Sequence, residues 1–276
     1  MQSRSGVVGS TWIQLFLGGL AIYVIVEQAL VRTGNPNYIP TLLVVGAFLV
    51  PVTMVAYLYE REPVRDVPLA TVAVCFLWGG ALGTVIAGLL EYRTLHALGP
   101  LALLGVGLIE ESAKLVVPLG LYLRGRYRSE ADGLLFGVAS GMGFAALETM
   151  GYGFVALLQS RGSIGALELT LLLRGLLSPA GHAAWTGLVC AVLWRERERG
   201  RPGFSPAVVG AFVAAVLLHA LWDLLASLNA ASPVVSGVLE LLSLGVALVS
   251  LGLLIWRLRE ARREGPAGET QRAPAD

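Results

Sequence analysis

The sequence is poor in charge, in lysine and in cysteine. Only 14% of its 276 residues are charged, against about 25% in a typical soluble domain. With 55% hydrophobic residues, this shortage excludes an ordinary soluble domain and indicates a membrane protein with several spans. The net charge of +1 provides no positive field for nucleic acid, so no such partner is predicted. The two cysteines, Cys75 and Cys190, lie in apolar runs and predict no extracellular disulfide framework.

Apolar runs recur along the whole chain, each close to the ~20 residues that cross the hydrocarbon of a bilayer. We expect an all-α, polytopic bundle of about eight transmembrane helices. The runs cover residues 9–31, 40–59, 68–90, 99–123, 133–158, 168–194, 205–228 and 233–256. They would form a single transmembrane bundle over 1–260, with a catalytic core over about 70–230 and a disordered cytoplasmic tail over 261–276.

The arginines are unevenly distributed among the segments between these runs. With a cytoplasmic N-terminus, the opposite side holds only Arg32, Arg93 and Arg161, with Arg174 near that boundary. Positive residues accumulate on the cytoplasmic side of membrane proteins, so both termini are predicted to be cytoplasmic. The preference for arginine over lysine is also typical of GC-rich prokaryotic genomes. We therefore expect a multi-pass protein of a prokaryotic plasma membrane, surrounded by the lipid bilayer.

The only lysine, Lys114, follows two adjacent glutamates within a hydrophobic run, "GLIEESAKLVVP" at 107–118. Glu110 lies four residues before Lys114 and Glu111 three, so both carboxylates can reach the ammonium group in a helix. One ammonium neutralises only one carboxylate, so the other must be protonated, bound to a cation or hydrated. The trio predicts acid–base chemistry. A self-compensated structural ion pair is the alternative.

The fifth run carries a ridge of glycines and one glutamate. In "DGLLFGVASGMGFAALET" (132–149), three glycines follow at four-residue steps, which should let this helix approach a neighbour closely. Glu148 lies on nearly the same face, one turn after Phe144, so it should point into the bundle. The alternative is a buried structural glutamate bonded to a backbone carbonyl or a serine.

The sixth run combines a proline with a histidine. In "RGLLSPAGHAAWTG" (174–187), Arg174, Ser178 and His182 follow one another at four-residue steps, on one face of a continuous helix. Pro179 removes a helical hydrogen bond, which predicts a kink just before His182. A broken membrane helix beside a polar residue often marks a site. A satisfied core histidine is the alternative.

The seventh run contains "HALWD" (219–223), which places His219 and Asp223 four residues apart. A carboxylate at this spacing can orient an imidazole and fix its tautomer. A helix-stabilising pair is the alternative. Glu110, Glu148 and His219 lie about nine to eleven residues from the same membrane surface, so their depths agree within a few ångströms. We expect them to meet in one water-bearing cavity, which His182 could join.

Carboxylates and imidazoles around a shared water suit hydrolysis. A glutamate can accept the proton of the attacking water, and imidazoles can stabilise the oxyanion or protonate the leaving amine. The same side chains could hold Zn²⁺, with Glu148, His182 and His219 as candidate ligands. The sequence has no H-E-x-x-H motif, and a metal-free glutamate mechanism fits it as well.

Four segments resemble, in order and spacing, the motifs of PrsW-type intramembrane proteases, distant relatives of the CAAX-processing and bacteriocin-immunity membrane proteases. The segments are "EESAK" (110–114), "DGLLFGVASGMGFAALET" (132–149), "GHAAWTG" (181–187) and "HALWD" (219–223). The resemblance covers about residues 70–230 and implies hydrolysis of a peptide bond in a membrane-anchored protein, by a metalloprotease or a glutamic-type protease. One family member acts on a membrane-anchored anti-sigma factor.

The resemblance implies that the catalytic residues are Glu110, Glu111, Glu148, His182 and His219. We expect Glu110 to be the general base and Glu111 to pair with Lys114, or the reverse. Glu148 and His182 would hold or polarise the water or a metal. His219, oriented by Asp223, would stabilise the oxyanion or a metal.

A proton- or divalent-cation-coupled transporter is the main alternative, because buried Glu and His residues also carry ions across membranes. Two features favour the protease: the polar motifs show no inverted repeat, and the polar groups share one depth instead of forming a ladder. A catalytically silent scaffold that binds membrane helices is a third hypothesis. The sequence does not determine the oligomeric state.

Overall fold

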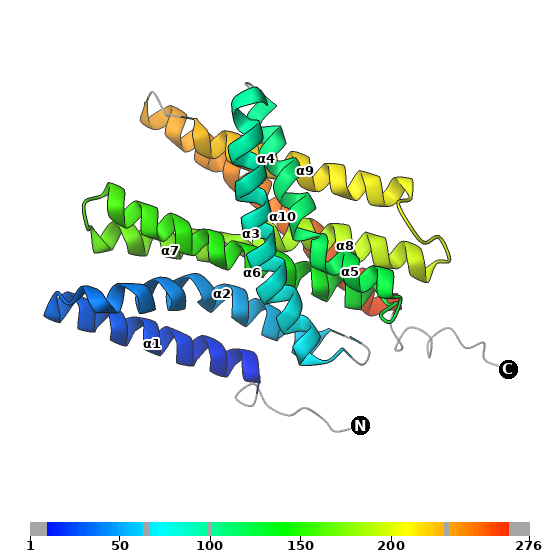
Figure 1. Cartoon of the computed structure of the whole chain (residues 1–276), viewed down its shortest axis with the longest axis horizontal. Helices are drawn as coiled ribbons and strands as arrows, with labels where there is room; N and C mark the ends of the chain where they lie inside the picture. Colours follow the sequence, from blue (N-terminus) through cyan, green and yellow to red (C-terminus); the bar gives the residue numbers. More distant parts are fainter. Residues whose placement is uncertain (1–9, 63, 65–66, 99–100, 229–231, 265–276) are drawn as a thin grey trace. The chain divides into compact units, whose positions relative to one another are not determined.

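The computed structural model describes residues 10–62, 64, 67–98, 101–228 and 232–264, and these residues form helices and no strand (Figure 1). The predicted all-α class is confirmed. The helices are α1 (Thr11–Thr33), α2 (Ile39–Arg61), α3 (Leu69–Leu98), α4 (Ala102–Lys114), α5 (Val116–Arg124), α6 (Glu130–Gln159), α7 (Ile164–Leu177), α8 (His182–Glu198), α9 (Pro206–Ser227) and α10 (Pro233–Glu264), with short 3-10 turns at Pro36–Tyr38 and Ser178–Ala180.

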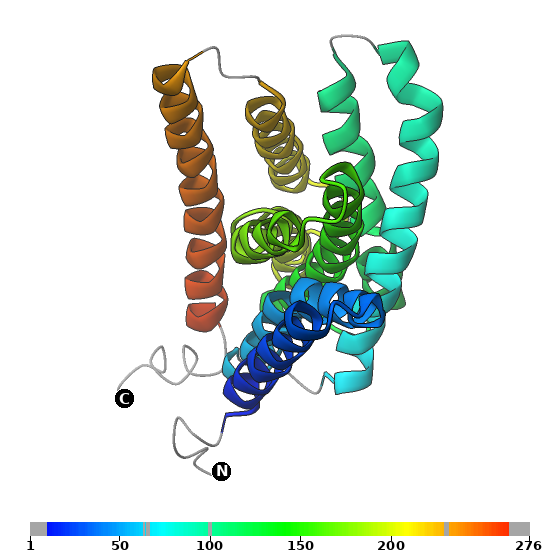
Figure 2. The ribbon, with the colours of Figure 1, turned by 90° about the vertical axis from the view of Figure 1, so that its left-hand side faces the viewer.

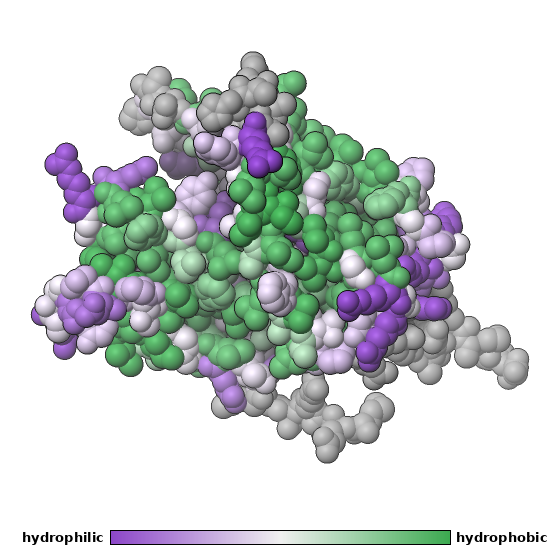
Figure 3. All heavy atoms as spheres, in the orientation of Figure 1, coloured by the Kyte–Doolittle hydropathy of each residue, from purple (hydrophilic) through white to green (hydrophobic). Residues whose placement is uncertain are grey.

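Seven helical stretches among the described residues are long and apolar enough to cross a membrane. They are Thr11–Thr33, Pro36–Arg61, Leu69–Arg93, Glu130–Gln159, Ile164–Glu198, Pro206–Ser227 and Val234–Arg263. Figure 3 shows that apolar side chains dominate the visible surface of the helices. The cytoplasmic placement of the termini stays a prediction. The run expected over 99–123 is missing from this set, because its described part, 101–123, is divided between two short helices, α4 and α5, while residues 99–100 lie outside the described residues.

The break between α4 and α5 has a cause in the sequence. Pro118 has no N–H, so the carbonyl of Lys114, four residues earlier, loses its usual helical partner. The hydroxyl of Ser140 from α6 donates to that carbonyl at 2.6 Å. The helix is interrupted at Leu115, whose N–H bonds to the carbonyl of Ser112 instead. Lys114 therefore lies at the end of a helix, where its backbone is held by a side chain of another helix.

The break between α7 and α8 has the same cause. Pro179 cannot donate to the carbonyl of Gly175, and the hydroxyl of Ser178 donates to it at 2.8 Å. α7 ends at Leu177, one 3-10 turn follows, and α8 begins at His182. The predicted kink before His182 is confirmed.

The chain divides into two compact units, each described by itself. The first contains the described residues of Met1–Arg61 and Ala145–Pro179, and the second those of Glu62–Phe144 and Ala180–Asp276. The single bundle expected over 1–260 stays a prediction. α10 continues to Glu264, so the helix includes the first residues of the expected tail, and the rest of that tail lies outside the described residues.

In the first unit, α1 and α2 run antiparallel, side by side, and α7 packs against α2 (Figure 1). An apolar core joins these helices to the second half of α6 and consists of Leu30, Leu42, Leu43, Ala47, Leu157, Leu167 and Leu171.

In the second unit, α3 and α4 run side by side (Figure 2), and α4 packs against α8 and α9. α6 approaches α8 along the predicted glycine ridge. A Cβ at Gly137 would lie 2.6 Å from the carbonyl oxygen of Thr186, and one at Gly133 would lie 2.5 Å from the ring of Trp194. Only glycine permits such an approach, so the expected close contact of this helix with a neighbour is confirmed.

Candidate active site

The ammonium group of Lys114 lies at the centre of a buried polar cluster in the second unit. Its Nζ is 3.0 Å from Glu110 Oε2, 2.9 Å from Glu111 Oε1 and 2.8 Å from His182 Nδ1. Lys114 and Glu111 are fully buried, and Glu110 is 7% exposed. An ammonium group has three N–H donors, and these three acceptors match that number. Lys114 therefore fixes both glutamates and one histidine at once.

The contact with Lys114 also determines the tautomer of His182. An ammonium group can only donate, so Nδ1 of His182 accepts and a neutral ring carries its proton on Nε2. The ring of Phe144 supports both partners: its centroid lies 4.2 Å from Lys114 Nζ and 5.5 Å from the His182 ring centroid. The cation–π contact favours the charged form of Lys114 at a position without access to water.

His219 joins the cluster from α9 and is 3% exposed. Its Nδ1 lies 2.9 Å from Glu111 Oε1, while Nε2 lies 3.5 Å from Glu110 Oε2 and 3.5 Å from Asp223 Oδ2. A carboxylate accepts, so Nδ1–H donates to Glu111. Glu111 is thus the nearer carboxylate to this imidazole, and the predicted orienting role of Asp223 stays a prediction. Asp223 lies on the other side of the ring and is half-buried.

Three residues that the sequence analysis did not single out complete the surroundings of His219 and Glu111. The hydroxyl of Thr186 donates to Glu111 Oε2 at 3.1 Å. The ring of Trp185 stacks on that of His219, with centroids 4.6 Å apart, and its Nε1–H donates to Ser250 at 2.9 Å. Thr186 follows His182 by one helical turn, so its position on the same helix face could have indicated from the sequence that it faces the site. Nothing near Ser250 in the sequence indicates its role.

The charges of the cluster do not balance. Glu110 and Glu111 can carry two negative charges, and Lys114 supplies one positive charge. Because an unpaired buried charge is costly, the cluster requires one further proton, on His219 or on a glutamate. A proton that can change its position within one buried cluster is what general acid–base catalysis uses.

Glu148, Arg174 and Ser178 belong to the first unit. Arg174 Nη2 lies 2.7 Å from Glu148 Oε2, and its guanidinium carbon lies 4.0 Å from the ring centroid of Tyr152. The helix is interrupted after Leu177, so the four-residue steps from Arg174 to His182 do not form one helical face. The structure thus pairs Glu148 with an arginine, and its predicted catalytic role stays a prediction.

The arrangement around Lys114 does not fit a metal ion. No group of three or more His, Cys, Asp or Glu side chains within the described part of the chain is placed to hold one. Glu110 Oε2, Glu111 Oε1 and His182 Nδ1, which could serve as ligands, all contact the ammonium instead. A metal ion cannot share these atoms with Lys114, because like charges repel each other.

The helices and this cluster define a class: a polytopic membrane protein with a buried acid–base site. A family model described as "PrsW family intramembrane metalloprotease" matches residues 67–254, more than half of the chain, and this range includes every member of the Lys114 cluster. The chain belongs to the PrsW family and is an intramembrane endopeptidase, which implies a protein substrate and a lipid bilayer around the helices. The family description is consistent with a metal ion. No curated protein and no solved structure matches the chain.

Proposed function

We propose that this protein hydrolyses a peptide bond of a membrane-anchored protein, at the cluster around Lys114, in the plasma membrane of a prokaryote. The observation that supports this proposal is the convergence of α4, α8 and α9 on one buried ammonium, with two carboxylates and two imidazoles around it. Such a set contains a base, a proton donor and a group that holds them in place. A membrane-anchored anti-sigma factor is a candidate substrate.

Glu110 is the general base in this proposal. Its carboxylate is the more exposed of the pair, with 9% of the side chain accessible against 1% for Glu111. Glu110 makes its contacts through Oε2, and Oε1 has no hydrogen-bond partner among the described residues. A water molecule that donates a hydrogen bond to Oε1 could therefore give its proton to the Glu110 carboxylate, which is largely shielded from solvent.

Glu111 and Lys114 act as positioning residues. Glu111 accepts hydrogen bonds from Lys114, Thr186 and His219, so its oxygens are occupied. Lys114 donates to three acceptors and holds Glu110 next to the histidines. Neither group needs to change its protonation state during the reaction.

The reaction then proceeds in two steps. The water oxygen attacks the scissile carbonyl carbon while Glu110 takes its proton, and N–H groups on Nε2 of His182 and of protonated His219 stabilise the resulting oxyanion. The C–N bond then breaks, and Glu110 returns the proton to the leaving amine. The products are a new carboxylic acid and a new amine, and the acid then gives its proton to the amine or to water, which leaves a carboxylate.

No step of this mechanism uses a metal ion. A Zn²⁺ ion, which the sequence analysis left open beside a metal-free mechanism, would require Lys114 to leave its position between the glutamates and His182. Glu148, the third candidate ligand, is paired with Arg174. We assign Glu148 a supporting role. The cleavage rate of a Glu148→Gln variant tests this assignment.

The test uses the purified protein in proteoliposomes with a membrane-anchored reporter, in water enriched in ¹⁸O. The proposal predicts one heavy oxygen in the new carboxyl end of the product, detected by mass spectrometry, and cleavage that persists with a chelator. Glu240→Gln changes an exposed glutamate of α10 that bonds to Ser236, so it serves as the control and should cleave like the wild type. Absence of cleavage, or its loss with chelator and return with zinc, would contradict the proposal.

A further inference from the structure

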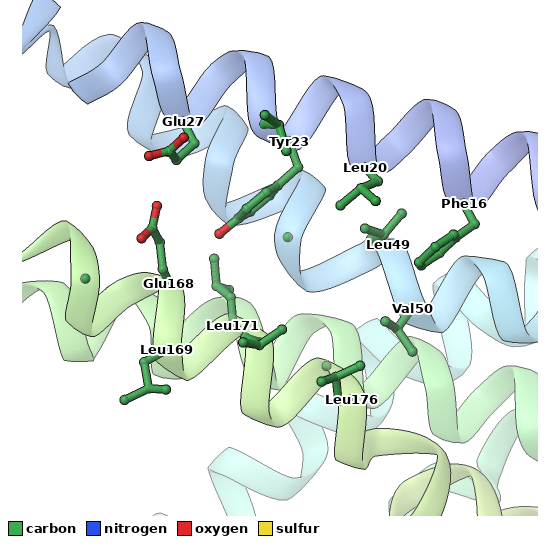
Figure 4. Close-up of a pocket in the computed structure, with 15 residues that line it drawn as sticks. Phe16, Leu20, Tyr23, Glu27, Leu49, Val50, Glu168, Leu169, Leu171 and Leu176 are labelled. Atoms are coloured by element: carbon green, nitrogen blue, oxygen red, sulfur yellow. The ribbon is translucent and has the colours of Figure 1, made fainter. Parts of the chain in front are cut away.

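The first unit contains an elongated cleft between α1 and α7, with α2 at its base (Figure 4). Its volume is about 500 Å³, within the range of about 300–1,000 Å³ that is typical of small-molecule sites. Most of its wall is apolar and is formed by residues such as Phe16, Leu20, Leu49, Val50, Leu172 and Leu176. The cleft therefore suits a hydrocarbon chain along most of its length.

One end of the cleft is acidic. Glu27 of α1 and Glu168 of α7 lie at this end with their carboxylates directed toward each other, and the Tyr23 side chain points from α1 toward α7 beside them (Figure 4). Glu168 Oε1 is buried and has no hydrogen-bond partner among the described residues. Two facing carboxylates repel each other. A ligand with a positive charge and N–H donors would relieve that repulsion.

The length of the cleft matches one leaflet of a bilayer. Phe16 and Glu27 are eleven residues apart on α1, which corresponds to about 16 Å along a helix. One leaflet supplies about 15 Å of the ~30 Å hydrocarbon core. The acidic end also lies near helix ends, since Glu27 and Glu168 are each within about two turns of the end of their helix.

We propose that this cleft binds an aminophospholipid of the phosphatidylethanolamine type. Its primary ammonium would lie between Glu27 and Glu168, donate to both, and leave an acyl chain to extend past Leu20 toward Phe16. A choline headgroup has the same charge but no N–H donor, and a glycerol headgroup has no positive charge. The acidic end should therefore discriminate among these lipids. This inference does not depend on the hydrolytic site.

A transmembrane segment of a protein is the other occupant to consider. Such a helix needs about 30 Å of apolar surface, roughly twice the length of this cleft. The match to one leaflet and the carboxylates at a single end favour the lipid.

Photocrosslinking in nanodiscs tests the proposal with the full-length protein. Phosphatidylethanolamine, phosphatidylcholine and phosphatidylglycerol, each with a photoreactive acyl chain, are compared at equal low fractions. Labelled peptides are identified by mass spectrometry. Peptides of α1 and α7 should be labelled about tenfold more by the phosphatidylethanolamine probe, as expected for charge-assisted hydrogen bonds. Equal labelling by the three probes would overturn the proposal.

Two variants separate headgroup recognition from the apolar cleft. The double variant Glu27→Gln, Glu168→Gln should reduce labelling by the phosphatidylethanolamine probe to that of phosphatidylcholine, whereas Glu240→Gln should change nothing. Gly175→Leu should lower labelling by all three probes, because a Cβ at Gly175 is tolerated and a longer side chain fills the cleft. The proposal fails if the double variant keeps the lipid preference. It also fails if a transmembrane peptide with a basic end, carrying the same photoreactive group, labels the cleft in place of the lipid.

Discussion

Two buried ion clusters in the second unit make an instructive comparison. Arg257 of α10 and Glu130 of α6 are each 1% exposed and form an ion pair, in which Arg257 Nε donates to Glu130 Oε1 at 2.8 Å. Around Lys114, the ammonium and Glu111 are fully buried and Glu110 is 7% exposed, and two carboxylates and two imidazoles surround one ammonium. Both clusters join helices that are far apart in the sequence.

The difference shows that burial of charge does not by itself mark a catalytic site. In the Arg257–Glu130 pair, a guanidinium that stays charged faces one carboxylate, so the pair itself needs no further proton. The Lys114 cluster needs one more proton to be neutral, and several of its atoms can carry it. We therefore expect substitutions in the first cluster to affect stability alone, and substitutions in the second to affect catalysis as well.

Substitution at the centre of the cluster should have the largest effect. Lys114→Met leaves two buried carboxylates without their cation, so we expect a loss of about 3–5 kcal/mol in the free energy of unfolding. Cleavage should fall by more than about a thousandfold, because the base and the oxyanion donors lose their positions together. Denaturant titration and the cleavage rate per folded molecule measure both effects. A cleavage rate of Lys114→Met within tenfold of the wild-type rate would show that Lys114 is not part of the catalytic site.

Glu111→Gln should be nearly as damaging to catalysis. Its carboxylate orients His219 through Nδ1 and also binds Lys114 and Thr186. Loss of a carboxylate that fixes the tautomer of a catalytic histidine costs about 10⁴ in the rate of a serine protease, so we expect at least about a hundredfold here. Glu130→Gln is the comparison variant, and its cleavage rate per folded molecule should stay near that of the wild type. Similar cleavage rates for Glu111→Gln and Glu130→Gln would contradict a catalytic role that is specific to the Lys114 cluster.

Asp223→Asn should have a smaller effect. Asp223 lies 3.5 Å from His219 Nε2 and is half-buried, so it influences the imidazole less than Glu111 does. We expect a loss of about tenfold in the cleavage rate, the low end for residues that orient a functional histidine. A loss as large as that of Glu111→Gln would return the orienting role to Asp223, as the sequence first suggested.

Arg257→Met should have the smallest effect on catalysis. The substitution removes the guanidinium from a buried ion pair with Glu130, so the free energy of unfolding should fall by about 3–5 kcal/mol. The cleavage rate of the molecules that remain folded should stay near that of the wild type, because Arg257 is not part of the Lys114 cluster. If Arg257→Met and Lys114→Met lowered the cleavage rate per folded molecule equally, the Lys114 cluster would have no catalytic role distinct from that of the Arg257–Glu130 pair.

Local spacing accounts for the parts of the site that the sequence predicts well. The contacts of Lys114 with Glu110 and Glu111 follow from their separations on one helix, and the close approach of α6 to α8 follows from three glycines on one face. Pro179 predicted the break before His182. Pro118 carried the same signal for the break at Leu115, but the hydrophobic run around it indicated one continuous span.

Contacts between distant segments could not be predicted in this way. The helical spacing of His219 and Asp223 indicated a local pair, whereas the fold brings Glu111 closer to the imidazole from another helix. The stacking of Trp185 on His219 and its hydrogen bond to Ser250 depend on how α8, α9 and α10 pack. No periodicity in the sequence contains that information.

The most direct test is the rate of cleavage of a membrane-anchored reporter by Glu110→Gln under single-turnover conditions, beside the wild type and Glu240→Gln in the same proteoliposomes. Glutamine keeps the size of the side chain but cannot take a proton from water. We predict a rate at least about a hundredfold below that of the wild type, with an unchanged amount of folded protein and wild-type cleavage by Glu240→Gln. Cleavage by Glu110→Gln at the wild-type rate would contradict the assignment of the base at this cluster.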